Sequence, residues 1–249
     1  MPCAGGYTPP WTNGVVAIPA STQIAISYVV WCVSGGTTVA KQFGVATFDT
    51  VTKTFVSNAT AVFVGSPLDR THQLGNPVLF DDGTGPAMYF TADDCTSTAF
   101  GACGAGTLKI ARVALVGTRP WETAASYRWW TGSTWSTDPA AAVNDVSGIT
   151  PIDTSIMQIG GLPGGPFVLL EEPDIAGGFR AWTAPTPTGP WTLRRSDLLV
   201  PDCGTGTGLD LCRAIIGHSE LSIAGASSTI AYSAFRPSDQ KVCVGWFTL

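Results

Sequence analysis

The 249-residue sequence has few charged residues and no long apolar run. Charged side chains make up 12% of the chain, about half of the roughly 25% that is usual in globular domains. The longest basic run is Arg194-Arg195 and the net charge is −5, so the basic cluster that follows a phosphate backbone is missing. No apolar run approaches the ~18 residues that a membrane-spanning helix needs. We therefore expect neither nucleic acid nor a membrane as a partner.

Several catalytic and binding signatures are also missing. The sequence has no Gly-x-Ser-x-Gly motif, no phosphate-binding glycine loop and no zinc-ligand spacing. Asp81-Asp82-Gly83 and Asp93-Asp94 carry ligand atoms suited to calcium, but both segments are more typical of hairpin turns. We therefore expect no cofactor and no metal site.

Seven cysteines suggest an oxidising compartment. Cys95 and Cys103 flank one small loop, and Cys203 and Cys212 flank another. These spacings favour two disulfides, with buried thiols or a metal site as the alternatives. The other three cysteines are Cys3, Cys32 and Cys243, so one bridge among them would leave one free thiol. Which two of them pair is left open by the sequence.

The start of the chain lacks a signal peptide. Met1-Pro2-Cys3-Ala4 has neither a basic segment nor an apolar one. Since disulfides indicate a secreted or extracellular protein, we expect either a mature form or a fragment that has lost its N-terminal part.

Turn residues and β-prone residues are abundant instead. The chain has 29 Gly, 18 Pro and 9 Trp, and 45% of its residues are hydrophobic. Short runs rich in Val, Ile, Thr and aromatic residues alternate with Gly, Pro, Asn and Asp, as in 148–185. This pattern predicts an all-β fold with an ample core.

The strands fall into about four units of three or four strands, at a period of roughly 60–80 residues. Such a period predicts a β-propeller, in which radially packed sheets cover one another. A two-sheet sandwich would need about 7–9 strands, fewer than the sequence offers. We expect a single domain over 1–249 with four visible blades, at 14–64, 71–137, 144–200 and 211–249.

A polar residue stands just ahead of the short first run of each unit: Asn13, Asn76, Asp153 and Glu220. Because the first strand of a propeller blade is innermost, we expect these four side chains around one axis. Two carboxylates in such a pocket could divide acid–base work, one with a raised pKa and one that stays ionised. On sugars, a carboxyl separation of about 6.5–9.5 Å leaves room for an inverting water.

Short motifs carry a resemblance to a known family. They are Asn76-Pro-Val-Leu-Phe-Asp-Asp-Gly, Ile152-Asp153-Thr-Ser-Ile, His218-Ser-Glu220-Leu-Ser and Pro-Thr-Gly-Pro-Trp191. They resemble blade motifs of the five-bladed propeller glycosidases of the family 43 and family 32 type. The chain looks still closer to uncharacterised secreted bacterial domains with this propeller. The resemblance covers most of 14–249 and implies five blades in a complete protein.

The resemblance also implies roles for single residues. Glu220 would be the general acid and Asp153 the carboxylate that tunes and orients it. The position of the catalytic base falls on Asn76, whose amide cannot accept a proton at neutral pH. The residues expected to bind substrate are Asn13, Asn76, His72 and His218. The predicted function is a glycoside-hydrolase-like protein that acts on or binds a glycan, and the alternative is a non-catalytic propeller that binds a glycan or a protein.

Each of these residues also has a purely structural interpretation. Asp153 could cap a turn, and Glu220 could pair with Arg213 or Arg236. Glu171 and Glu172 are expected on an exposed rim. Five tryptophans could stack on sugars or fill the spaces between blades, and the second role is more typical of large aromatics: Trp129, Trp130, Trp135, Trp182 and Trp191.

Overall fold

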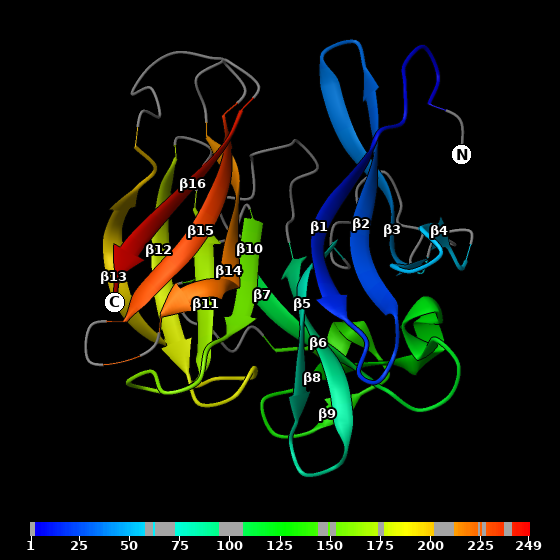
Figure 1. The fold of residues 1–249 in the computed structure, drawn as a ribbon. Coiled ribbons are helices and arrows are strands. Elements are labelled where there is room, and N and C mark those ends of the chain that lie inside the picture. Colours follow the sequence, from blue (N-terminus) through cyan, green and yellow to red (C-terminus); the bar gives the residue numbers. More distant parts are fainter. Residues whose placement is uncertain are drawn as a thin grey trace.

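A computed structural model of the chain describes residues 3–57, 62, 73–94, 107–143, 149, 153–173, 177–201, 212–223, 225, 228–236 and 241–249. These residues form an all-β fold of four antiparallel sheets in a propeller arrangement (Figure 1). The helices among them are 3-10 turns of three residues each, and none is long or apolar enough to span a membrane.

The first two blades are up-and-down sheets. Blade 1 has the order β1 (Pro10–Ala17), β2 (Gln23–Ser34), β3 (Thr37–Asp49) and β4 (Thr54–Phe55). Blade 2 has the order β5 (Gln73–Asp81), β6 (Pro86–Asp94), β7 (Thr107–Ala114), β8 (Tyr127–Trp130) and β9 (Trp135–Ser136). The 3-10 turns η1 (Pro120–Glu122) and η2 (Ala124–Ser126) precede β8, and η3 (Pro139–Ala141) follows β9.

The last two blades follow the same plan. Blade 3 has the order β10 (Asp153–Gln158), β11 (Phe167–Glu172), β12 (Gly178–Ala184) and β13 (Thr192–Leu199). Blade 4 has three strands, β14 (Arg213–Ile223), β15 (Thr229–Arg236) and β16 (Lys241–Thr248). In Figure 1, blade 1 lies on the right, blades 3 and 4 lie on the left, and blade 2 lies below and between them.

The β5–β6 hairpin shows how local sequence ends a strand. Asp81 accepts backbone hydrogen bonds from Gly83 and Gly85 at 2.9 and 3.1 Å, and Gly83 has a φ of 92° that glycine adopts without strain. The interpretation of Asp81-Asp82-Gly83 as a hairpin turn is confirmed. The side chains of Asp93 and Asp94 lie outside what the structure describes.

Apolar side chains fill the spaces between successive blades. One buried cluster, which includes Ala25 and Phe90, joins blades 1 and 2. A second, which includes Tyr89 and Phe167, joins blades 2 and 3. A third, which includes Phe179 and Ile230, joins blades 3 and 4. Since each sheet covers its neighbour's face, the radial packing gives the chain its core.

The predicted tryptophans belong to these spaces. Trp129 is buried in the cluster between blades 1 and 2, and Trp182 is buried between blades 2 and 3. Trp130, Trp135 and Trp191 are partly buried against the latter cluster. The structural interpretation of these residues is confirmed.

Hydrogen bonds join the first strands of neighbouring blades. The Asn13 amide donates to the Leu74 carbonyl at 2.7 Å, from β1 to β5. The Asn76 amide donates to the Ile156 carbonyl at 3.1 Å, from β5 to β10. These bonds fix the order and spacing of the blades where they converge.

A serine makes the corresponding hydrogen bond between blades 3 and 4, and glycines allow the first strands to lie close together. Ser155 on β10 accepts the backbone N–H of Gly217 on β14 at 3.0 Å. At Gly217 a Cβ atom would lie 2.7 Å from the Met157 sulfur, and at Gly14 it would lie 2.6 Å from the Asn76 Cα atom. Only a residue without a side chain allows the first strands to approach this closely.

The ring of contacts runs from blade 1 to blade 4. The first strands β1, β5, β10 and β14 contact one another in that order, and β14 has no comparable contact with β1 in the described part of the chain. The face of blade 4 turned away from blade 3 carries Val242, Val244 and Trp246, which are 67%, 49% and 57% exposed. In the described ranges, the first strands of blades 1 and 4 therefore do not close the ring as the other first strands do.

Two adjacent glutamates differ from the sequence expectation. Glu171 and Glu172 are 0% and 1% exposed, so the prediction of an exposed rim is wrong. Glu171 accepts the indole N–H of Trp182 at 2.8 Å, and Glu172 accepts the backbone N–H of Ala214 at 3.1 Å. Consecutive residues of a strand point to opposite faces, and both faces of blade 3 are covered by neighbouring blades.

The cysteines left unassigned by the sequence are now resolved. Cys3 and Cys32 form a disulfide across 29 residues, and Cys243 is a free thiol. Cys212 is also disulfide-bonded, while Cys95, Cys103 and Cys203 lie outside the described residues.

We expect the double variant Cys3→Ser/Cys32→Ser to lower the free energy of unfolding by about 3 kcal/mol, since the bridge restricts the unfolded chain. Urea denaturation without reductant measures the loss, and an unchanged midpoint would contradict it.

Candidate functional site

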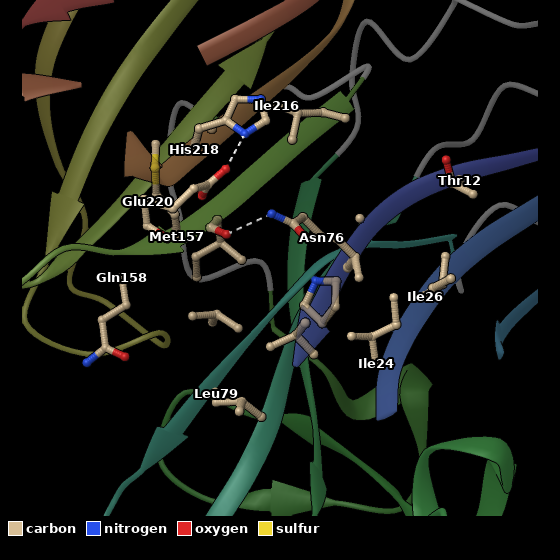
Figure 2. Close-up of a pocket in the computed structure, with 18 residues that line it drawn as sticks. Thr12, Ile24, Ile26, Asn76, Leu79, Met157, Gln158, Ile216, His218 and Glu220 are labelled. Atoms are coloured by element: carbon tan, nitrogen blue, oxygen red, sulfur yellow. Dashed lines mark hydrogen bonds and ion pairs between the residues drawn. The ribbon is translucent and has the colours of Figure 1, made fainter. Parts of the chain in front are cut away.

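A cavity of about 690 Å³ opens between the four first strands (Figure 2). β1, β5, β10 and β14 each contribute a wall, and β2 adds Ile24 and Ile26. Aliphatic side chains dominate the lining, and none of the described residues that form it is a Phe, Tyr or Trp. Its polar side chains are Thr12, Asn76, Gln158, His218, Ser219 and Glu220.

The two predicted asparagines, Asn76 and Asn13, differ in whether they line the cavity. Asn76 lines the cavity, but its amide is bonded to Ile156 and to the Ser155 hydroxyl at 3.3 Å. Its side-chain oxygen is buried and has no hydrogen-bond partner among the residues that the structure describes. Asn13 lies between two lining residues, Thr12 and Gly14, where β1 has a register shift. Its side chain is turned to β5, where it bonds Leu74.

The remaining predicted residues are placed as follows. Asp153 is the first residue of β10, and its backbone pairs with Glu172 of β11. The residues of β10 that line the cavity are Ile156, Met157 and Gln158. The Asp153 side chain is not among the parts that the structure describes, and His72 lies outside the described residues. Their proposed roles stay predictions.

His218 and Glu220 come together on β14. The Nδ1 atom of His218 lies 2.8 Å from a Glu220 carboxylate oxygen, and Figure 2 shows this contact at the cavity wall. The other ring nitrogen, Nε2, lies 2.9 Å from the Ser233 hydroxyl of β15. The motif His-Ser-Glu places the histidine and the glutamate on one face of the strand, but nothing in the sequence pointed to Ser233.

The pKa of Glu220 lies below its ordinary value of 4.5. Burial raises this pKa, but hydrogen bonds from the residue's own backbone and from His218, with the charge of His218, outweigh burial. A lowered pKa means that Glu220 is ionised at neutral pH. The stability that the ionised carboxylate contributes is therefore fully present above pH 4.5 and is lost as the pH falls through the lowered pKa.

We expect NMR titration to place the pKa of Glu220 below 4.5 in the wild type and nearer 4.5 in His218→Gln, which removes the imidazole that is hydrogen-bonded to the carboxylate. A wild-type pKa above 4.5 would contradict this electrostatic picture.

No cluster of three or more His, Cys, Asp or Glu side chains within the described ranges could hold a metal ion. The polar groups that the described residues present at this site are a carboxylate, an imidazole, two amides and two hydroxyls. Ionised Glu220 can accept hydrogen bonds from hydroxyls, and the aliphatic walls can pack against apolar parts of a ligand.

The sequence matches no protein-family model and no curated protein. Solved structures do share the fold. A protein of Bacteroides ovatus described as a hydrolase has a TM-score of 0.54 at 12% identity, with 90% of this chain and 54% of that one covered. A protein described as a glycoside hydrolase has a TM-score of 0.51 at 12% identity, with 98% and 73% covered.

An α-L-arabinofuranosidase of Lactobacillus brevis has a TM-score of 0.50 at 12% identity, with 100% of this chain and 76% of that one covered. This chain thus spans about half of the first of these proteins and about three quarters of the others. Its fold is therefore a propeller of the kind found in these proteins, in agreement with the fold that the resemblance implied. At 12% identity the likeness shows the fold alone.

Proposed function

We propose that this protein is a secreted, glycoside-hydrolase-like propeller that binds a glycan in the cavity between its first strands. The main support for this proposal is that the first strands of all four blades line one cavity that holds an ionised carboxylate and a histidine. Carboxylates and imidazoles are suited to sugar hydroxyls, because they accept and donate hydrogen bonds in fixed directions. The fold neighbours named as glycoside hydrolases support a carbohydrate ligand.

Binding is favoured over hydrolysis for two reasons. An amide stands at Asn76, the position at which the resemblance implies a base. A general acid needs a raised pKa, whereas the pKa of Glu220 is lowered.

Glycoside hydrolysis is the second candidate function. It is favoured by the carboxylate of Glu220 at the cavity and by Asp153 at the start of the neighbouring strand β10. In this reading Glu220 would donate the proton and Asp153 would assist.

A glycan array and a panel of chromogenic glycosides test both candidates. We expect the wild type to bind at least one glycan without turnover, and Glu220→Gln to bind about tenfold more weakly, since it loses a charge-assisted hydrogen bond. Asp197→Asn is the matched control, because Asp197 is an exposed carboxylate on β13 outside the cavity.

Turnover of a glycoside that is lost in Glu220→Gln would favour the second candidate. Folded protein that binds no glycan and cleaves no glycoside would refute both.

A further inference from the structure

Three polar side chains on blade 4 form a chain of hydrogen bonds. The Ser233 hydroxyl lies 2.9 Å from His218 Nε2, and His218 Nδ1 lies 2.8 Å from the Glu220 carboxylate. This is the order that nucleophilic catalysis requires: a hydroxyl on one ring nitrogen, and a carboxylate that orients the ring through the other.

The strand register explains why the three groups meet. His218 pairs with Ala231, two residues before Ser233 on β15, so His218 and Ser233 are diagonal neighbours on one face of the sheet. Ile230, Tyr232 and the rest of the opposite face are packed against blade 3. The hydroxyl therefore belongs to the face of blade 4 that is turned away from blade 3.

That face has exposed apolar surface beside the serine. Ser233 is 8% exposed and pairs with Ile216 on one side and Val244 on the other. Val244 and Trp246 are 49% and 57% exposed, and β14 has no comparable contact with the first strand of blade 1 in the described chain. A short apolar group can thus rest on Val244 next to the serine oxygen.

We propose that Ser233, His218 and Glu220 form a nucleophile–base–carboxylate triad that hydrolyses carboxylic esters with a short apolar acyl group. Ser233 and His218 are the catalytic residues, and Glu220 is a positioning residue that acts through His218. The activity does not depend on glycan binding and uses no group other than these side chains and water.

The chemistry would proceed in two balanced steps. The Ser233 oxygen bonds to the carbonyl carbon of the ester while His218 Nε2 takes the hydroxyl proton. The carbon–oxygen bond to the alcohol then breaks, and the alcohol leaves with the proton from His218. A water attacks the acyl-serine, gives its proton to His218 and releases the carboxylic acid, and the proton returns to Ser233.

Two measurements test the triad on the whole chain. The first is labelling of the wild type with a fluorophosphonate probe, followed by mass spectrometry of the peptides. The second is hydrolysis of p-nitrophenyl acetate and p-nitrophenyl butyrate. We expect the adduct on Ser233 and faster hydrolysis than in buffer, with a loss of about 100-fold or more in Ser233→Ala.

Variants separate catalysis from structure. Glu220→Gln should lower kcat about tenfold or more with little change in KM, because it weakens only the orientation and charge of His218. Glu220→Asp should recover part of that loss. Ser196→Ala on β13 is the control, since Ser196 is an exposed serine of another blade. Melting temperatures of all variants report whether they fold.

Either of two results would overturn the proposal. One is a folded wild type with no adduct on Ser233 and no ester hydrolysis above the buffer rate. The other is hydrolysis that persists in folded Ser233→Ala. Adduct mapping on the wild type decides the question even if Ser233→Ala does not fold, because it needs no variant.

Discussion

Gly14→Ala should lower the free energy of unfolding by about 3 kcal/mol, the upper end of the usual cost of overpacking. A methyl group at this position would overlap the side chain of Asn76 and lie 2.6 Å from its Cα atom. A backbone atom cannot rotate away, so β1 would have to move from β5. That movement would also strain the hydrogen bond from Asn13 to Leu74. Urea denaturation measures the loss.

Gly160→Ala is the matched control for this prediction. Gly160 is exposed, and a Cβ atom there would have nothing within 4 Å. Its free energy of unfolding should stay within about 0.5 kcal/mol of the wild type. Equal stability of the two variants would mean that blades 1 and 2 do not approach each other at Gly14.

Glu171→Ala is expected to cost about 3 kcal/mol of stability. The variant leaves the buried indole N–H of Trp182 without its acceptor and removes the carboxylate that pairs with Arg180 at 3.4 Å. A buried donor without a partner carries its full desolvation cost, whereas Arg180, whose side chain is 34% exposed, can be hydrated and adds little. Thermal and urea denaturation both report the effect.

Two comparison variants sharpen this test. Glu171→Gln keeps an oxygen for Trp182 and should lose about half as much. Asp197→Ala breaks the ion pair between Asp197, whose side chain is 71% exposed, and Arg195. Its free energy of unfolding should fall by less than about 1 kcal/mol. If Glu171→Ala lowered the free energy of unfolding no more than Asp197→Ala does, Glu171 would not be buried as described.

The propeller could be predicted because its signal is local. Each sheet is a meander of neighbouring strands, so alternation of β-prone runs and turns such as Asp81–Gly83 marks its strands one after another. The recurring polar residue before each first run also pointed to the strands that line the cavity, where Asn76 and Glu220 lie.

The contacts between blades could not be predicted in the same way. Asn13 and Asn76 were expected to face a ligand, yet both amides bond the backbone of the next blade. Which way such a side chain turns depends on the register shift in its strand, which composition does not reveal. Glu171 and Glu172 are buried for a related reason, since only the assembled fold shows that blade 3 is covered on both faces. Ser233 likewise became visible only through the register of β14 with β15.

The serial connection of the blades has a consequence for how the molecule comes apart. Each blade draws its stabilising contacts from its own strands and from the blade next to it in sequence, so its energetics are those of a linear array with nearest-neighbour coupling. Blades 2 and 3 have two such neighbours, whereas blades 1 and 4 have one. Hydrogen exchange should therefore be fastest in the outer blades and slowest in β6 and β11.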